Sequence, residues 1–414
     1  ATDPKGELSK LTAARRGRGS ARCKGMNKPT YVVDGYRVSD LPDEFMASFN
    51  PLDLLDPKDD QVIDRASMIV NAIVIRAGGD HSHFDDNAIG FLKGLLLYIV
   101  STEERSDSRN LIRLYDLANC GLKQKSSARG SDGDDEDDAI FNLIYEMSRC
   151  EALDGVIAAA GNLLLDMGER ERGSVLSTAR RNLAFLERPA VRRMLCRSTF
   201  SFDEMKKSKE GASIYICLPS ERQHDCQRIL RLAVTCGMQS AYDNPGPAAS
   251  GHPILFLLEE FASLGHMEMI ETAAGYAAGF GVKLWVILQD LAQLKRHYKQ
   301  GWETFLGNAG VIQAFGNSDL TTLEYISKKL GQTETIQPVQ SVTTSLTSST
   351  NDPGEFQRLQ PLLQSRGAGL VLNPIGLLFD SKSQSSSTST TNATNNQVQR
   401  SSLMQPDEIE RYFR

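Results

Sequence analysis

The chain has 414 residues, of which 40% are hydrophobic and 24% are charged, and its formal net charge is −6. A chain of this length and composition can form the hydrophobic core of one large domain or two ordinary ones. Its negative net charge excludes a protein that binds polyanions through bulk charge. The seven cysteines have no CxxC spacing, which argues against a disulfide framework or a zinc site and favours a reducing, cytoplasmic compartment. No apolar run approaches the roughly 20 residues that cross a bilayer, so we expect the chain as given to be soluble.

The first 57 residues alternate between strand and helix patterns. Residues 1–7 are typical of a strand end and its exit loop, residues 8–16 of a basic helix, and residues 30–33 of a second strand. This alternation predicts a parallel α/β sheet. Because Ala1 has no preceding Met and the helical pattern of residues 402–414 ends without a cap, we expect a fragment of a longer protein.

Residues 58–197 carry helical patterns only. Apolar residues recur at helical spacing in three segments, around Val62–Ile73, Ile89–Ile99 and Val175–Leu186. We therefore expect an all-helical domain inserted into the α/β domain.

The α/β pattern resumes after residue 197. Buried strands are expected at residues 213–219 and 254–258, and a further apolar strand at residues 282–288, with helices between them. Residues 335–401 are rich in Ser, Thr, Asn and Gln. Within this insertion, residues 369–372 and 375–379 are compatible with an extra strand pair, and residues 381–396 are expected to form a flexible loop.

Two carboxylates follow directly after the apolar run 254–258. Glu259 and Glu260 stand where this strand leaves the sheet, and ligands of open α/β sheets bind at the carboxyl ends of strands. Carboxylates are costly to bury unless they are paired or bind a metal. An apolar strand that ends in two acids is how nucleoside triphosphatases place one acid near Mg²⁺ and one near the attacking water. The alternative is a core strand followed by two acids in a solvated loop.

Gln289 follows the next predicted strand. If successive βα units pair in order, its amide lies beside Glu259 and Glu260, where it can contact a γ-phosphate. Alternatively, Gln289 only caps the next turn. A phosphate-binding motif of the form Gly-x-x-x-x-Gly-Lys-Ser/Thr is not present in the sequence. Residues 19–25 imitate it, but they lack the glycine before Lys24 and the hydroxyl residue after it.

Three further features have two interpretations each. Residues 1–28 and 170–197 each carry eight basic and two acidic side chains, which fits either a nucleic-acid backbone or a solvated helix face. His81 and His83 with Asp85 and Asp86 fit either a metal cluster or a helix N-terminus that an aspartate caps. We favour the helix N-terminus.

Taken together, the motifs of this chain resemble those of type IV secretion coupling proteins, the TraG-type conjugative ATPases of the FtsK/TraG superfamily. The resemblance rests on segments in the family's own order, namely residues 3–7, 49–55, 83–88, 172–180, 258–265, 289–294, 307–310, 315–319 and 403–410. Residues 258–265 match the Walker B segment, and residues 289–294 match the sensor motif.

The resemblance implies a RecA-like P-loop NTPase with a mostly parallel sheet and an inserted all-helical domain. The nucleotide-binding domain would comprise residues 1–57 and 198–414, and the helical domain residues 58–197. The implied activity is an ATP-driven translocase that recruits relaxase-bound single-stranded DNA or protein substrates to a secretion channel during conjugation. The implied partners are relaxosome and channel proteins, in a homo-hexamer at the cytoplasmic face of the bacterial inner membrane. N-terminal helices outside this sequence would provide the membrane anchor.

The resemblance also implies roles for individual residues. ATP and Mg²⁺ would be the cofactors, with Glu259 toward Mg²⁺, Glu260 polarising water, Gln289 sensing the γ-phosphate, and Asp3 and Lys5 near the nucleotide. One departure is Glu259, where the family usually has Asp. The other is the missing phosphate loop, because of which we expect residues 1–414 alone to be inactive.

Two other functions remain open at this point. One is a DNA-pumping ATPase of the FtsK/HerA kind, which would be separated from a coupling protein by the partners that it captures. The other is a non-catalytic adaptor, which the Glu259 departure and the missing phosphate loop favour.

Overall fold

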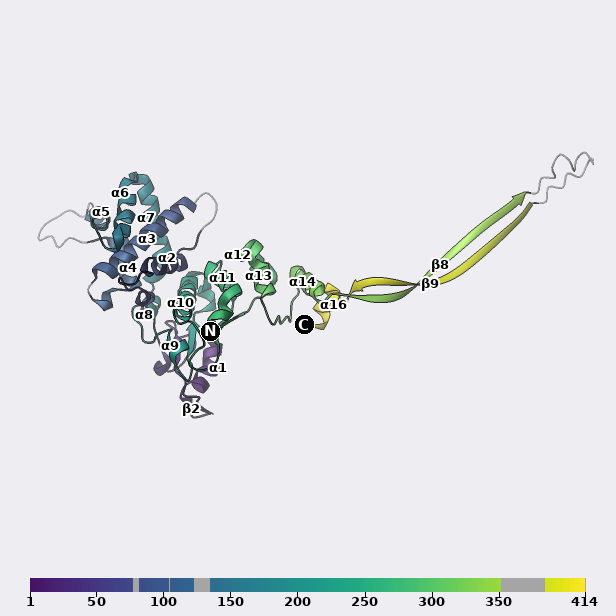
Figure 1. Ribbon diagram of the computed structural model, residues 1–414, viewed down its shortest axis with the longest axis horizontal. Helices are drawn as coiled ribbons and strands as arrows, with labels where there is room; N and C mark the ends of the chain where they lie inside the picture. Colours follow the sequence, from purple (N-terminus) through teal and green to yellow (C-terminus); the bar gives the residue numbers. More distant parts are fainter. Residues whose placement is uncertain (77–81, 104, 123–134, 351–383, 414) are drawn as a thin grey trace, which may run out of the picture. The chain divides into compact units, whose positions relative to one another are not determined.

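The computed structural model describes residues 1–76, 82–103, 105–122, 135–350 and 384–413 (Figure 1). The chain forms two compact units, Ala1–Ala314 and Phe315–Arg414. Within the described residues, no helix combines the length and apolar character that crossing a membrane requires.

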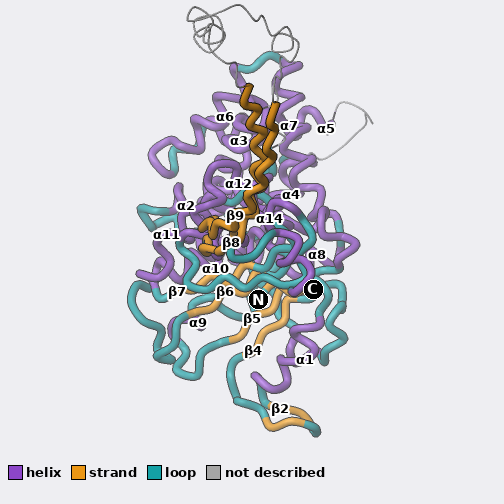
Figure 2. The backbone as a smooth tube through the Cα atoms, turned by 90° about the vertical axis from the view of Figure 1, so that its right-hand side faces the viewer, coloured by secondary structure: helices purple, strands orange, loops and turns teal. Residues whose placement is uncertain are grey.

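A five-stranded sheet forms the centre of the first unit. Its strand order is β4-β5-β1-β6-β7, and all four pairings are parallel, as the sequence predicts. Figure 2 shows β4, β5, β6 and β7 side by side. The strands are β1 (Thr2–Asp3), β4 (Thr30–Val33), β5 (Ser213–Cys217), β6 (Ile254–Leu258) and β7 (Val282–Val286). A separate short hairpin joins β2 (Gly19–Ser20) to β3 (Cys23–Lys24).

Helices pack on this sheet because apolar side chains line it. All five residues of β5 are buried, and Tyr215 and Cys217 of β5 pack with Ala13 of the basic helix α1 (Glu7–Arg16). The remaining helices of this part of the unit are α9 (Glu204–Lys207), α10 (Gln223–Asp243), α11 (Glu268–Tyr276), α12 (Leu291–Tyr298) and α13 (Trp302–Gly307).

Between β4 and β5, the described residues form helices and no strand. Besides α9, the α-helices here are α2 (Val62–Ile73), α3 (Ser82–Thr102), α4 (Leu111–Cys120), α5 (Asp135–Ser148), α6 (Val156–Asp166), α7 (Glu169–Leu183) and α8 (Pro189–Leu195). We call α2 to α8 the helical block. Its core consists of residues at helical spacing, and Leu92, Leu95, Leu96, Val175 and Leu183 are fully buried. Whether residues 58–197 form a separate domain stays a prediction.

Asn50 ties the sheet region to the helical block. Its Oδ1 accepts a hydrogen bond from Leu52 N at 3.2 Å, and its Nδ2 donates to the carbonyl of Arg109 at 2.7 Å. Its own main-chain N–H donates to Ser198 Oγ at 2.8 Å. The segment 49–55 that resembles a family motif therefore lies at the entry to the helical block, as expected.

The second unit contains a long antiparallel ribbon. It consists of β8 (Gln332–Thr350) and β9 (Gln384–Ser402), flanked by α14 (Leu320–Leu330) and α16 (Pro406–Tyr412). The expectation of a flexible loop at residues 381–396 is wrong for residues 384–396, which lie in β9. Their Ser, Thr and Asn side chains give no apolar alternation, yet Thr favours strands and the main chain pairs along its whole length. The strand pair expected at residues 369–379 lies outside the described residues.

Two glycines of the helical block offer a matched test of its packing. A Cβ on Gly161 of α6 would lie 2.5 Å from the main-chain nitrogen of Ser148, whereas a Cβ on Gly173 of α7 meets nothing within 4 Å. We expect Gly161→Ala to destabilise the protein by about 1–3 kcal/mol through overpacking. Gly173→Ala should stabilise it by about 0.5–1 kcal/mol, because Gly is unfavourable in a helix interior. Denaturant unfolding of both variants checks this, and equal effects would contradict the described packing of α6 on α5.

Candidate functional site

The acid-bearing segment and Gln289 lie at the same edge of the sheet. Leu258 of β6 pairs with Val286 of β7, and the pairing continues past both strand ends. Ile287 N donates to the Leu258 carbonyl at 3.1 Å, and Phe261 N donates to the Ile287 carbonyl at 3.1 Å. The residues that follow each strand are therefore held together by main-chain hydrogen bonds.

Gln289 contacts Glu260 directly. Its Nε2 lies 3.4 Å from both carboxylate oxygens of Glu260. Its Oε1 accepts a hydrogen bond from Gln293 Nε2 at 3.2 Å, in the first turn of α12, which Asp290 caps through Gln293 N. The amide of Gln289 is thus oriented between α12 and the acid. The expected neighbourhood of these two side chains is present.

Glu260 has an unfavourable backbone conformation. Its φ is 51° and its ψ is 48°, in the left-handed region that residues other than Gly and Asn rarely adopt. Such a conformation costs on the order of 1–2 kcal/mol and persists only where the surroundings enforce it. At Glu260 this turn directs the chain from β6 into the short 3-10 helix Phe261–Leu264.

Phe261 anchors this turn in the core. Its side chain is 1% exposed, its ring stacks on Tyr298 at 5.7 Å between centroids, and it also contacts Phe305 at 5.6 Å. These rings come from α12 and α13, the elements that follow Gln289 in the chain. The same apolar cluster therefore positions both sides of the candidate site.

Glu259 faces other negative charges. Burial, followed by the neighbouring charges of Asp3, Glu260 and Glu7, raises the pKa of its carboxyl above the ordinary value, while Lys5 opposes this shift. Its main-chain carbonyl accepts a hydrogen bond from the Thr2 hydroxyl at 2.9 Å, which links it to β1. A carboxylate crowded by other carboxylates suits a divalent cation, since the cation removes the repulsion.

Asp3 is completely buried behind the site. Its Oδ2 accepts from Ser9 N at 2.7 Å and its Oδ1 from Leu8 N at 3.3 Å, so it binds the first turn of α1. Backbone amides at a helix N-terminus stabilise a negative charge. Asp3 thereby fixes the loop that carries Lys5, and its charge reaches Glu259 without exposure to solvent.

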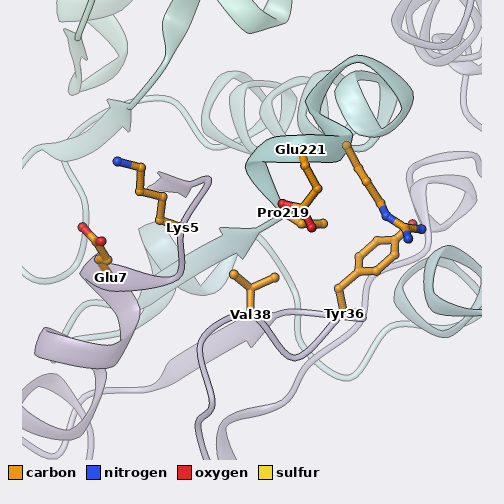
Figure 3. A pocket seen from close by; sticks show the side chains of 7 residues that line it. Lys5, Glu7, Tyr36, Val38, Pro219 and Glu221 are labelled. Atoms are coloured by element: carbon orange, nitrogen blue, oxygen red, sulfur yellow. The ribbon is translucent and has the colours of Figure 1, made fainter.

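Lys5 lies on the exposed side of this loop. It lines a hollow of about 510 Å³ together with Glu7, Tyr36, Val38, Pro219, Glu221 and Arg222. In Figure 3, Lys5 and Glu7 lie on one side of this hollow and Tyr36 on the other, and the amino group of Lys5 points away from Tyr36. Burial, together with a hydrogen bond to Cys226, raises the pKa of Tyr36 to about 12. The sequence did not single out Tyr36 or Glu221, because neither follows an apolar strand directly.

Other sequence-level candidates have structural partners. At least four arginines of the basic patch 170–197 donate to main-chain carbonyls of the chain itself, which are those of Leu164 (from Arg172), Ala118 (from Arg180), Leu186 (from Arg192) and Gly35 (from Arg193). This favours a packing role for these side chains.

The histidine-rich segment shows no metal site where it is described. Asp85 lies within α3 and is 1% exposed, 3.6 Å from Arg181. His83 contacts Glu171 and Asn87, and His81 lies outside the described residues. Across the part of the chain that the structure describes, no group of three His, Cys, Asp or Glu side chains is arranged to hold a metal. A magnesium ion on Glu259 would need phosphate oxygens and water as its other ligands.

Comparison with known proteins identifies the family. A sequence model described as "Type IV secretory system Conjugative DNA transfer" matches residues 1–365. The chain belongs to this family. The resemblance to TraG-type coupling proteins is therefore confirmed.

Two curated relatives illustrate the match. Conjugal transfer protein TraG of Escherichia coli is 27% identical over 358 residues, which is 83% of this chain and 52% of that protein. Protein VirD4 of Agrobacterium fabrum is 28% identical over 338 residues, which is 80% of this chain and 45% of that protein. The chain thus spans about half the length of the curated relatives it matches.

Solved structures confirm the fold class. The conjugative coupling protein TrwBdeltaN70 superimposes with a TM-score of 0.58 at 14% identity, covering 99% of this chain and 71% of that one. The plasmid coupling protein TrwB in complex with ADP and Mg²⁺ superimposes with a TM-score of 0.56 at 15% identity, covering 80% of this chain and 67% of that one. The chain has the RecA-like α/β fold, with a mostly parallel sheet.

The electrostatics of Glu259 predict a pH-dependent stability. Because its pKa is raised in the folded state, its ionised form destabilises folding at neutral pH. This effect disappears at acidic pH, where the carboxyl is protonated in both states, below the ordinary value of about 4.3. We expect Glu259→Gln to raise the melting temperature at about pH 7.5 without divalent cations. This gain should shrink as the pH falls from the raised folded-state pKa towards the ordinary value, and most of it should be lost at about pH 4.

Thermal denaturation monitored by circular dichroism at both pH values checks this expectation. Glu324→Gln, at an exposed glutamate in the middle of α14, is the control and should change little at either pH. An equal gain for Glu259→Gln at both pH values would mean that packing, not charge, is responsible.

Proposed function

We propose that the gene product carrying this chain is an ATP-driven coupling protein of conjugative DNA transfer. The observation that carries the proposal is the contact of Gln289 with Glu260 at the carboxyl edge of a parallel sheet, beside the crowded carboxylate of Glu259. Phosphoryl transfer needs this combination of a metal-binding acid, a water-orienting acid and a polar group for the γ-phosphate.

In this proposal Glu259 binds Mg²⁺ and Glu260 orients the attacking water. Gln289 reports the state of the γ-phosphate to α12, because its oxygen already accepts a hydrogen bond from Gln293 of that helix. Lys5, on the exposed side of its loop, contributes positive charge near the nucleotide. Asp3 supports this loop from the core instead of touching the nucleotide, since its carboxylate binds the main chain of α1. Mg²⁺ and ATP supply the electrophilic phosphorus and the charge neutralisation when they are bound.

ATP hydrolysis also needs a phosphate-binding loop, which residues 1–414 do not contain in its Gly-Lys-Ser/Thr form. Such a loop would have to approach the carboxyl edge of the sheet. Apolar side chains are exposed on the strands that end at this edge, because Leu255 of β6 and Trp285 of β7 are 52% and 54% exposed. We propose that another segment of the complete gene product covers these apolar side chains when the nucleotide binds.

Membership of the family supports a proposal for the biological role. We propose that the motor works as a homo-hexamer at the cytoplasmic face of the bacterial inner membrane. Its substrates would be relaxase-bound single-stranded DNA or secreted proteins, delivered to a secretion channel. The helical block is our candidate for contact with relaxosome or substrate proteins, as a domain inserted between β4 and β5.

Substitution of Glu260 tests the catalytic assignment. In the complete gene product, Glu260→Gln should reduce ATP turnover by roughly 10²-fold or more, the usual share of a positioned base. Nucleotide affinity should remain, because the substitution keeps the size and polarity of the side chain. Steady-state ATPase assays and binding of a fluorescent ATP analogue in the presence of Mg²⁺ measure the two effects.

Glu268→Gln serves as the control in the same assays, since Glu268 lies in α11 and is exposed. Full turnover of the Glu260→Gln variant would refute the assignment. No nucleotide binding by the unmodified gene product would favour the non-catalytic adaptor instead.

A further inference from the structure

Arg231 is a buried cation in the middle of α10. Its side chain is 7% exposed, and burial lowers the pKa of its guanidinium to about 10. A charge in such surroundings is costly unless its donors are satisfied. The partners of Arg231 therefore indicate what this residue does in the fold.

The guanidinium donates four hydrogen bonds to main-chain carbonyl oxygens. Two acceptors belong to the last turn of α2, where Nε donates to Ala72 at 2.9 Å and Nη2 donates to Asn71 at 2.8 Å. The other two belong to the segment after Glu260, where Nη1 donates to Leu264 at 2.8 Å and to His266 at 2.7 Å. One side chain thus binds the first helix of the helical block and the turn that carries the candidate acid.

The backbone between Leu264 and His266 is shaped for this contact. Gly265 has a φ of +63°, and a Cβ at this position would lie 2.8 Å from Gln227 Nε2, which belongs to the turn of α10 preceding Arg231. A side chain here would be strained by the positive φ and would displace the amide of Gln227. Glycine at this position allows both neighbouring carbonyls to reach the same nitrogen of Arg231.

A groove lies beside this connection. A groove of about 1490 Å³ is lined by residues of α2, α10 and α11, among them Met68, Gln239 and Thr272, and Arg231 itself lies on its wall. Arg231 therefore binds α2 and the segment after Glu260 at the wall of this groove, while the rest of α10 packs on both of them. A guanidinium suits this task, since its planar fork of donors holds several acceptors in a fixed geometry.

We propose that Arg231 is a positioning residue that couples the acid-bearing turn to the helical block. When Glu260 and its turn rearrange, the carbonyls of Leu264 and His266 move Arg231, and Arg231 moves the C-terminal end of α2. The source of that movement, nucleotide binding, rests on the proposed function. The linkage itself rests on the four hydrogen bonds of Arg231 and does not depend on nucleotide binding.

Arg228 provides a matched comparison on the same helix. Its Nε donates to the carbonyl of Ile73 at 2.8 Å, and its Nη2 donates to Asn182 Oδ1 at 2.9 Å. Arg228 therefore binds the same end of α2, but it continues to α7 within the helical block. Removing Arg228 should loosen α2 while leaving the coupling through Arg231 in place.

Hydrogen–deuterium exchange followed by mass spectrometry tests the coupling in the complete gene product. Without nucleotide, Arg231→Met should raise exchange in both residues 66–75 and residues 261–267, whereas Arg228→Met should raise it in residues 66–75 and 178–185. With Mg²⁺ and a non-hydrolysable ATP analogue, the unmodified protein should change its exchange in both linked segments. In Arg231→Met the response should persist at residues 261–267 and be lost at residues 66–75, and Arg228→Met should keep both responses.

Arg231→Lys keeps the charge and serves as the second variant if Arg231→Met does not fold. A single ammonium cannot hold all four carbonyls, so the response at residues 66–75 should again be lost. A nucleotide response at residues 66–75 that persists in these variants would overturn the proposal. If the unmodified protein shows no nucleotide response at all, the proposed function fails. The comparison without nucleotide still decides the linkage. If Arg231→Met raises exchange in only one of the two segments, residues 66–75 or residues 261–267, the linkage through Arg231 is refuted.

Discussion

Mutual repulsion of carboxylates at one edge of the sheet is the constraint on which the candidate site depends. Burial, followed by the charges of Asp3, Glu260 and Glu7, raises the pKa of the Glu259 carboxyl. An arrangement of this kind is unfavourable for a folded protein by itself, and functional sites are where proteins retain such arrangements. The rest of the fold has to hold these charges in place, because left alone they would separate.

Several independent elements provide this restraint. Main-chain pairing continues beyond β6 and β7, so that the segments with Glu260 and Gln289 cannot separate without breaking the ladder. Phe261 adds a buried aromatic cluster below the turn. Arg231 then connects the far end of that turn to α2. The site is therefore built on strand ends and core contacts, which fix side chains more accurately than a free loop would.

Part of this arrangement could be predicted from the sequence and part could not. Apolar runs at residues 254–258 and 282–288 indicated neighbouring strands, and from these the proximity of Gln289 to Glu260 followed. Burial of β6 on both faces was wrong, because Leu255 is about half exposed. The burial of Asp3 could not be predicted, because whether a carboxylate faces a ligand or a helix N-terminus depends on the path of the next helix. The role of Arg231 was equally hidden, since its acceptors are main-chain carbonyls, which any sequence provides.

The second unit contains strands that the sequence pattern does not reveal. Sequence patterns detect strands through alternation between apolar and polar side chains. The ribbon of β8 and β9 lacks this alternation, because Ser, Thr, Asn and Gln point to both of its faces. A strand that pairs only through its main chain and buries neither face needs no apolar residues, so the composition of the segment does not indicate it. The prediction of a loop there failed for that reason, although the low-complexity character of the segment was recognised.

The left-handed backbone of Glu260 has a consequence for anyone who engineers this protein. Selection of random variants for thermostability or expression would favour Gly or Asn at this position, since both relieve the φ of 51°. Those variants would pass every screen for solubility and yield while losing the carboxylate. Position 260 should therefore be kept fixed in a stability-directed library. Where it is left free, the frequency with which Glu260 is replaced would measure the stability that the protein gives up to keep a carboxylate at this position.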